Sequence, residues 1–301
     1  MKRMTLAFLL LCVSLWAQGY DDVTDDYMLA EADVPEAEFG RGRFICDSEE
    51  LQGVRFKYCY RDPDSANNND IVYFFHGLNG SEKTWHRQFL GTRTIQDWWE
   101  LRGYRPRIIS VSFGPQWLLV NNKRYPLLPA FTRVIMPFVE KKVGGLKGGQ
   151  RHIIGQSMGG FNAAEISLKN PGMFSKVALL CPALATISPF ASDREIDAYI
   201  RRTGALRCQV EKMQRISQSV FVDKKDWDNH DPLRLISRYP KGKKPRFYVS
   251  IGRNDGYGFQ EGSAAFIKGA QAFSFLFSWV PVPGPHCNFK RIGTANFIMG
   301  D

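Results

Sequence analysis

Residues 151–160 have the sequence Arg-His-Ile-Ile-Gly-Gln-Ser-Met-Gly-Gly, and these ten residues are the clearest indication of the fold class. The short apolar run 152–154 predicts a buried strand, and a helical pattern begins directly after Ser157. A serine on such a sharp turn has a strained backbone and an exposed hydroxyl, and it needs small neighbours, here Gly155 and Gly159. The alternative is a glycine-rich turn around a buried serine.

Short apolar runs and helical patterns alternate on both sides of this turn. We expect strands near residues 71–75, 107–113, 152–154, 176–180, 246–251 and 275–282, and helices near 94–101, 131–142, 158–169 and 262–273. Alternation of this kind predicts an α/β fold with a mainly parallel central sheet and helices on both faces. Segments near Phe44 and residues 54–60 are candidates for an antiparallel edge.

A long connection interrupts the alternation between residues 182 and 245. It contains several prolines and the basic stretch 241–244. We expect a small helical insertion at about 182–245 that covers the strand ends. An extended connection with two helices is the alternative. The domain as a whole is expected to span residues 43–301.

The N-terminus predicts export. Lys2 and Arg3 precede an apolar run from Leu6 to Trp16, and small or polar residues follow it. This arrangement is typical of a signal peptide, here residues 1–17, because the run is short for a membrane span. A short membrane anchor or a buried helix is the alternative. We therefore expect a secreted or periplasmic protein.

Charge is distributed unevenly along the chain. The segment 18–42 contains eight acidic and no basic side chains between residues 21 and 38. Without the signal peptide and these acids, the chain has 38 basic and 22 acidic residues, a net charge of +16. This charge favours anionic partners, such as a membrane face, an acidic polysaccharide or a negatively charged substrate. No nucleic-acid-binding motif accompanies it, so nucleic acid is not an expected partner. The acidic segment is expected to be a solvated linker, and folding back over the basic surface is the alternative.

Loss of the signal peptide leaves five cysteines, which allow at most two disulfides within the chain. A bond between Cys46 and Cys59 would bracket a predicted hairpin. A bond between Cys181 and Cys208 would close a loop and leave Cys287 free. Five buried thiols are the alternative, since a core of this size does not require disulfides.

A serine nucleophile needs a base, and the chain offers five histidines. His286 follows the last predicted strand, at the sheet edge where Ser157 is expected to lie. His152 begins the strand that leads to Ser157 and is too distant. The sequence favours His286 as the base and leaves His230 as its main rival. The alternative for His286 is a loop residue that caps backbone groups.

Asp255 is the candidate for the acid that orients this histidine. It follows the predicted strand 246–251 and lies between Ser157 and His286 in the chain, which gives the order Ser, Asp, His. An Asp-Gly pair is also a simple turn signal. Three aspartates of the long connection are alternatives: Asp226, Asp228 and Asp231.

A tetrahedral intermediate needs two donors for its oxyanion. The N–H group of Met158, directly after the serine, is the first candidate. The second is the N–H group of Leu78, in the loop His76-Gly77-Leu78-Asn79-Gly80 that follows a predicted strand. An Asn-Gly turn without a ligand is the alternative for this loop.

Three stretches carry a family resemblance: the turn Gly155–Gly160, the helix exit Asn170–Phe174 and the loop His76–Leu78. Together they resemble the esterase family of the α/β-hydrolase superfamily, which includes esterase D, feruloyl esterases and the antigen 85 mycolyltransferases. The likeness covers roughly residues 45–295. It implies an α/β-hydrolase fold. Cys287, the acidic segment and the long basic insertion depart from the family pattern.

By this resemblance, Ser157 is the nucleophile, His286 the base and Asp255 the orienting acid. Leu78 and Met158 donate to the oxyanion. These roles agree with those inferred from the residues themselves.

We therefore expect an exported serine esterase that acts on small-molecule or polysaccharide-linked esters. Neither a metal nor an organic cofactor is expected, because no His-Glu-x-x-His or Cys-x-x-Cys pattern occurs. An acyltransferase of the same fold and an inactive binding protein for an anionic surface polymer are the alternatives. Four aromatic residues are candidates for lining the substrate pocket, although packing in the core is the favoured interpretation for most of them: Trp85, Trp117, Trp227 and Phe259.

Overall fold

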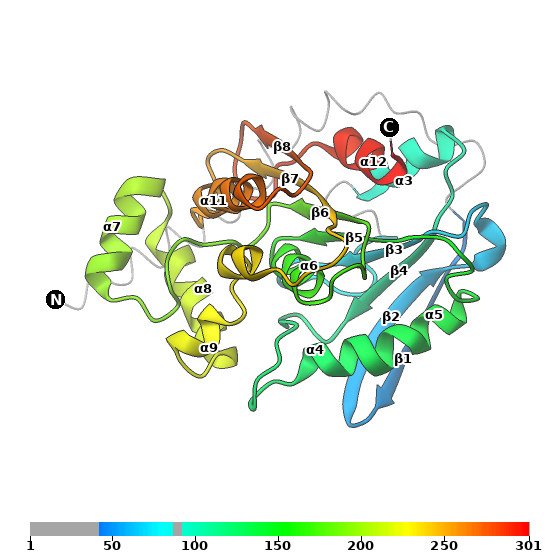
Figure 1. Cartoon of the computed structure of the whole chain (residues 1–301), viewed down its shortest axis with the longest axis horizontal. Coiled ribbons are helices and arrows are strands. Elements are labelled where there is room, and N and C mark those ends of the chain that lie inside the picture. Colours follow the sequence, from blue (N-terminus) through cyan, green and yellow to red (C-terminus); the bar gives the residue numbers. More distant parts are fainter. Residues whose placement is uncertain (1–41, 87–91, 301) are drawn as a thin grey trace, which may run out of the picture. The chain divides into compact units, whose positions relative to one another are not determined.

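Eight strands form one sheet in the computed structural model, which describes residues 42–86 and 92–300 (Figure 1). The strands are β1 (Phe44–Leu51), β2 (Val54–Arg61), β3 (Ile71–Phe75), β4 (Arg107–Ser112), β5 (Arg151–Gln156), β6 (Lys176–Leu180), β7 (Arg246–Gly252) and β8 (Phe277–Val282). Their order in the sheet is β1-β2-β4-β3-β5-β6-β7-β8. The pairs β1–β2 and β2–β4 are antiparallel, and every other pair is parallel. The predicted α/β fold with its antiparallel edge is confirmed.

Helices cover both faces of this sheet. The longer ones are α3 (Thr92–Leu101), α5 (Met136–Lys142), α6 (Met158–Lys169), α7 (Asp193–Thr203), α8 (Arg207–Val220), α11 (Phe259–Ala272) and α12 (Arg291–Met299). The shorter ones are η1 (Pro63–Ser65), α4 (Leu127–Ala130), η3 (Phe131–Ile135), α9 (Lys224–Asp228), α10 (Pro232–Leu235) and η4 (Ile236–Arg238). Helices α3 and α12 lie together on one face, whereas α5 and α6 cover the other (Figure 1).

The central strands are buried on both sides, which explains their continuous apolar sequences. Val72 and Phe74 of β3 belong to the core that contains α3 and α12, whereas Tyr73 and Phe75 belong to the core beneath α5 and α6. Alternate side chains of a strand point to opposite faces, so both sets must be apolar when helices cover both faces.

The helix α12 was not predicted from the sequence. Its buried residues include Arg291 and Thr294 beside Ala295 and Phe297, so it shows no clear apolar stripe. The predicted helix 131–142 is correct in place, but a π-helical turn, η3, connects α4 to α5 within it. These differences do not change the predicted fold class.

The long connection between β6 and β7 contains α7, α8, α9, α10 and η4. Ser192 and Glu195 form a capping box at the start of α7, and Gly204, with a φ of +74°, ends it. Helices α8 and α9 contribute side chains to the pocket above Ser157. The connection is therefore largely helical and positioned to shape the binding site.

Two disulfides between described residues connect elements of the sheet. Cys46 and Cys59 join β1 to β2, as expected for the hairpin. The suggested bond between Cys181 and Cys208 is wrong, because Cys181 is bonded to Cys287, whose Cα atom lies 4.8 Å away. The sheet brings the loops after β6 and β8 to one edge, and sequence separation gives no hint of this proximity.

The predicted signal peptide (1–17) and residues 18–41 of the acidic segment lie outside the described residues. None of the helices within residues 42–86 and 92–300 combines the length and apolar character needed to cross a bilayer.

Candidate active site

The turn between β5 and α6 consists of one residue, Ser157, because β5 ends at Gln156 and α6 begins at Met158. Its φ of +52° and ψ of −115° are strained for a residue with a side chain. The Ser157 N–H group donates to the carbonyl of Leu180 at the end of β6, at 2.9 Å. A Cβ atom on Gly159 would lie 2.0 Å from the carbonyl oxygen of Phe75. The turn therefore requires glycine there to approach β3.

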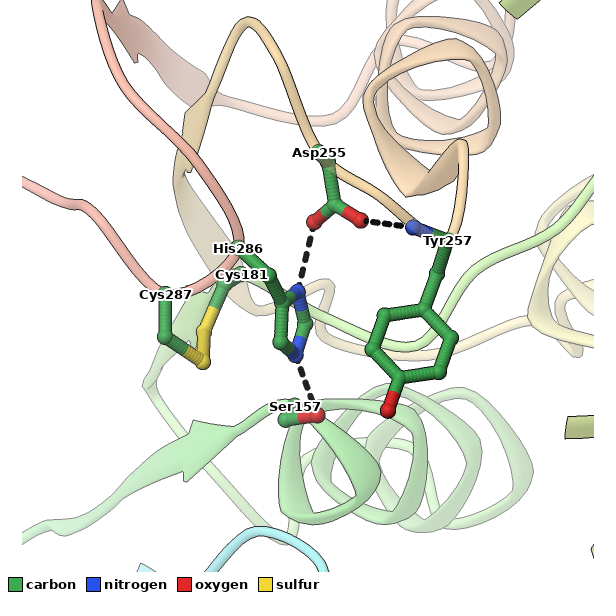
Figure 2. The surroundings of a disulfide bond; sticks show 6 residues. All are labelled: Ser157, Cys181, Asp255, Tyr257, His286 and Cys287. Atoms are coloured by element: carbon green, nitrogen blue, oxygen red, sulfur yellow. Dashed lines mark hydrogen bonds and ion pairs between the residues drawn. A yellow bond between two sulfur atoms is a disulfide. The ribbon is translucent and has the colours of Figure 1, made fainter. Parts of the chain in front are cut away.

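Three side chains from different loops form a continuous hydrogen-bonded series (Figure 2). Ser157 Oγ lies 2.9 Å from His286 Nε2, and His286 Nδ1 lies 2.6 Å from Asp255 Oδ2. The other carboxylate oxygen of Asp255 accepts a hydrogen bond from the Tyr257 N–H group, at 2.8 Å. The carboxyl side chain of Asp255 is fully buried. The structure thus brings together the three residues selected from the sequence.

The loop that carries His286 is held on several sides. The Asn254 N–H group donates to the carbonyl of Gly284, at 3.0 Å. On the opposite side, the disulfide from Cys287 anchors the loop to Cys181, directly after β6 (Figure 2). The ring of Tyr257 packs edge-on against the imidazole, with 4.9 Å between the ring centres. These contacts fix the imidazole between the hydroxyl and the carboxylate.

Both expected oxyanion donors lie close to the serine. Met158 is the first residue of α6, so its N–H group has no partner within the helix. Leu78 follows β3, and both residues line the same pocket as Ser157. In the described part of the chain, neither N–H group donates a hydrogen bond to another residue. Both remain available to a developing negative charge.

His76 supports the loop of Leu78 rather than reaching the serine. Its Nε2 atom lies 2.8 Å from Ser112 Oγ and 3.0 Å from Trp117 Nε1. Burial lowers the pKa of His76, although the carbonyl of Gly77 and the charge of Glu82 oppose this effect. The imidazole is therefore neutral near pH 7 and serves as a packed hydrogen-bonding group.

The rival base His230 belongs to a different cluster. Its Nδ1 atom lies 2.5 Å from Glu165 Oε1 on α6, and its Nε2 atom lies 3.6 Å from Asp226 Oδ1. Asp231 caps α10 through the Leu233 N–H group. Asp228 pairs with Lys224 and Arg234 on the same segment. This cluster connects the helical connection to α6 and contributes no group to the hydrogen-bonded series at Ser157.

An apolar pocket opens above Ser157. Its wall consists of Leu78, Leu118, Met158, Phe161, Ala183, Ile187, Pro189, Met213, Ile216, Ser217, Trp227, Tyr257 and Phe259. Among the residues that the structure describes, no charged side chain contributes to this wall. Trp227 and Phe259 line the pocket as expected, whereas Trp85 and Trp117 are buried in the two cores. The pocket suits an apolar group attached to the carbonyl that Ser157 would attack.

Two groups of cysteine and histidine side chains have ligand atoms within 4.8 Å of one another in the described residues. They are Cys46, Cys59 and His86, and Cys181, His286 and Cys287. In each group the two sulfur atoms form a disulfide, so neither offers the thiolates that metal binding requires. Neither group is a suitable metal site while its two cysteines are joined in a disulfide.

A family model with the description "Putative esterase" matches residues 53–293. The chain belongs to this esterase family. It is accordingly a serine hydrolase that acts on carboxylic esters, and its sheet is that of an α/β-hydrolase. The resemblance stated from the sequence is confirmed. Among curated protein sequences, none matches the chain significantly.

Solved structures of other esterases share the fold at low sequence identity. A ferulic acid esterase has a TM-score of 0.63 and 14% identity, over 86% of this chain and 95% of the other. A fluorophosphonate-binding serine hydrolase of Staphylococcus aureus has a TM-score of 0.62 and 15% identity, over 87% and 98%. A thermostable esterase from Pseudomonas putida has a TM-score of 0.60 and 20% identity, over 88% and 80%. At these identities, the comparisons support the fold alone.

Sequence reasoning missed two features of this esterase site. Tyr257 was not selected, although its N–H group holds Asp255 and its ring packs on His286. An aromatic residue two positions after the candidate acid was the available signal. The disulfide of Cys287 was also missed, because only the three-dimensional structure shows that Cys181 lies opposite this residue.

Proposed function

We propose that this esterase hydrolyses carboxylic esters through an acyl-enzyme formed on Ser157. The observation that carries the proposal is the hydrogen-bonded series from Ser157 through His286 to Asp255 at the floor of an apolar pocket. A serine hydroxyl becomes a useful nucleophile only when an adjacent base removes its proton, and His286 Nε2 is in position to do so.

The reaction proceeds in two balanced steps. Ser157 Oγ attacks the ester carbonyl while His286 accepts the hydroxyl proton, and Asp255 stabilises the resulting imidazolium. The Leu78 and Met158 N–H groups stabilise the oxyanion, and the tetrahedral intermediate collapses when His286 protonates the departing alcohol. Water then attacks the acyl-enzyme with the same base, which releases the carboxylic acid and restores the serine.

The pocket favours an apolar acyl group. Its walls are aliphatic and aromatic side chains from α8, α9 and the loops after β6 and β7. A charged acyl group would lose its hydration there without gaining a partner. We therefore expect esters of aliphatic or aromatic acids to react faster than esters of dicarboxylic acids.

We further propose that the esterase functions outside the cytoplasm. Two disulfides, Cys46–Cys59 and Cys181–Cys287, support this location, because disulfides persist mainly in oxidising compartments. The predicted signal peptide agrees with it. Separation of cell fractions, followed by detection of the protein, tests this location, and recovery only from the cytosol would contradict it.

Hydrolysis of a series of p-nitrophenyl esters tests the activity. We expect Ser157→Ala to lower kcat by about 1,000-fold or more, because the base and the oxyanion donors then lack a nucleophile. Ser237→Ala, an exposed serine of η4, is the matched control and should retain wild-type rates. Equal activity of the two variants would refute the proposal.

Product analysis in the presence of a competing alcohol separates hydrolysis from acyl transfer. Free acid as the main product supports the esterase, whereas transfer to the alcohol in preference to water supports the acyltransferase. A purely binding protein would show neither reaction, and its Ser157→Ala variant would bind ligands as the wild type does.

A further inference from the structure

Two sulfur atoms lie beside the imidazole of His286, and the proposed reaction does not use them. Cys287 follows His286 directly and Cys181 follows β6, so their disulfide lies at the same edge of the sheet as Ser157 (Figure 2). The two sulfur atoms and one ring nitrogen of His286 all lie within 4.8 Å of one another. Two reduced cysteines and a histidine that lie this close together are a typical set of protein ligands for zinc, with one position left open.

Backbone and side-chain hydrogen bonds, in addition to the disulfide, hold the two cysteines near the imidazole. The Cys181 N–H group donates to the carbonyl of Ser250 at 2.7 Å. In the loop that carries Cys287, the side-chain amide of Asn288 donates to the carbonyl of Pro283 at 2.9 Å. Reduction of the disulfide therefore leaves both thiols close to the imidazole. Their sulfur atoms need to lie about 3.8 Å apart to bind one zinc ion, since zinc–sulfur bonds are about 2.3 Å long and the geometry is tetrahedral.

The carboxylate of Asp255 already prepares the imidazole for a metal ion. Its Oδ2 atom lies 2.6 Å from His286 Nδ1, and the carboxyl side chain is fully buried. Histidines that bind zinc commonly donate their second ring N–H to such a carboxylate, which fixes the tautomer and orients the ring. The lone pair of His286 Nε2 is then available to the metal ion. Because this lone pair also accepts the proton of Ser157 in the proposed reaction, metal binding and catalysis exclude each other.

The charge of these ligands favours a divalent cation that prefers nitrogen and sulfur. Two thiolates and a neutral imidazole have a total charge of −2, which one Zn²⁺ neutralises. The pocket wall beside Ser157 is apolar, and such surroundings penalise a charge without compensation. Mg²⁺ and Ca²⁺ prefer oxygen ligands and suit this set poorly. The fourth position around zinc can take a water molecule or the Ser157 hydroxyl, whose oxygen lies 2.9 Å from His286 Nε2.

We propose that reduction of the Cys181–Cys287 disulfide creates a zinc site together with His286, and that zinc bound there inhibits the esterase. The reductant is a dithiol. Its first thiolate attacks the sulfur of the partly exposed Cys287, and the Cys181 thiolate leaves. Its second sulfur then displaces the Cys287 thiolate and closes a cyclic disulfide. Two electrons and two protons thus pass to the cysteines, and zinc replaces the two protons, which go to solvent.

The disulfide state therefore decides whether zinc inhibits the esterase. In the oxidised protein the two sulfur atoms are bonded to each other and offer no thiolate. The metal site is independent of the proposed function, whereas its inhibitory effect rests on that function, because zinc removes the base of the reaction.

The zinc dependence of ester hydrolysis tests the proposal. The esterase is reduced with a dithiol, which is then removed under argon because it binds zinc itself, and hydrolysis of p-nitrophenyl butyrate is measured over a range of zinc concentrations. The reduced esterase should be half-inhibited at a zinc concentration at least about 100-fold below that for the oxidised esterase, which lacks two of the three ligands. A chelator should restore the activity that the reduced protein had before zinc was added.

Replacing Cys181 and Cys287 by serine should remove this difference, so that zinc affects the protein equally before and after treatment with the dithiol. The single replacement Cys287→Ser leaves the buried Cys181 in place and gives the same test with less disturbance of the core. Circular dichroism verifies that each variant is folded. Equal zinc sensitivity of the oxidised and reduced wild type would overturn the proposal. Strong inhibition that persists in both variants after reduction would do so as well.

The matched control replaces Cys46 and Cys59 by serine. These cysteines also have their sulfur atoms within 4.8 Å of a histidine nitrogen, that of His86, but they join β1 to β2 at the far edge of the sheet. After reduction, this variant should be as sensitive to zinc as the reduced wild type. Loss of the sensitivity in the control would assign the inhibition to the β1–β2 cysteines and refute the proposal.

Absorption spectroscopy with Co²⁺ in place of zinc separates the metal site from the proposed function. The reduced control variant should show charge-transfer absorption from thiolate to cobalt, and this absorption should disappear when Cys181 and Cys287 are replaced as well. If the absorption behaves in this way but the protein hydrolyses no ester, the metal site stands and the hydrolytic function fails. If esters are hydrolysed but the reduced protein shows neither the cobalt absorption nor inhibition by zinc, the metal site fails alone.

Discussion

At the scale of single residues, the proposed reaction depends on where each charge and proton is held. Asp255 is buried and accepts hydrogen bonds from His286 Nδ1 and the Tyr257 N–H group. The carboxylate therefore keeps the proton of the imidazole on Nδ1 and leaves Nε2 free to accept one from Ser157. Replacing the carboxylate of Asp255 with the amide of asparagine keeps the shape of the side chain but removes its negative charge.

We predict that Asp255→Asn lowers kcat by about 10²–10⁴-fold and changes KM much less, because the lost interaction acts mainly in the transition state. Steady-state kinetics with a p-nitrophenyl ester measure both constants. Asp193→Asn on the exposed start of α7 serves as the control. A large rise in KM at constant kcat would assign Asp255 to ground-state binding instead.

A second residue-scale prediction concerns Asp231, in the cluster that joins the helical connection to α6. Burial raises the pKa of Asp231 to about 6 from its usual 3.8, although the Leu233 N–H group and Arg234 oppose this effect. The folded state therefore binds this proton more tightly than the unfolded chain. The resulting stabilisation is complete below pH 3.8 and is lost as the pH rises through about 6.

Asp231→Asn keeps the acceptor that caps α10 and removes the buried charge. We expect it to raise the free energy of unfolding by about 3 kcal/mol near pH 8 and to leave it unchanged near pH 4. Urea denaturation at the two pH values measures the difference. An equal effect at both values would show that the buried charge is not its cause.

At the scale of elements, the carboxyl ends of the parallel strands assemble the site. Ser157 follows β5, Leu78 follows β3, Asp255 follows β7, and His286 follows β8. A parallel sheet places all of these ends at one edge, so strand assignments, together with the glycine-flanked serine and the chain order Ser, Asp, His, allowed the candidate active-site residues to be selected from the sequence. The same reasoning does not specify loop conformations, because these depend on contacts between distant segments.

The disulfide between the loops after β6 and β8 is an element-scale feature that we expect to affect catalysis. Cys287 is adjacent to His286, and its bond to Cys181 limits the movement of the imidazole. Replacing both cysteines by serine should lower kcat at least about tenfold, because small displacements of a catalytic base are costly. KM should change less.

The matched control for this variant replaces Cys46 and Cys59, which join β1 to β2 at the edge of the sheet. We expect that double variant to lose stability while its kcat per folded molecule stays near that of the wild type. Circular dichroism and active-site titration correct both proteins for unfolded material. Equal kcat losses in the two double variants would indicate a general effect of disulfide loss.

At the scale of the whole molecule, the sheet predicted from the sequence agrees with the structure, whereas one of the covering helices and one of the disulfides were not predicted. The strands were predictable because burial on both faces imposes continuous apolar runs, as in β3. The helix α12 was not predictable, because it lacks an apolar stripe. The partner of Cys181 was not predictable either, because it depends on which distant segments lie close together in the fold.

Mass spectrometry of the acyl-enzyme shows directly whether Ser157 carries the acyl group during turnover. The esterase is mixed with a slowly hydrolysed p-nitrophenyl ester, quenched in acid and digested with trypsin. We predict one added acyl group on the peptide of residues 152–169, located at Ser157, and no such adduct in Ser157→Ala. An acyl group on a different residue, or turnover of the ester by the Ser157→Ala protein at the wild-type rate, would contradict the account.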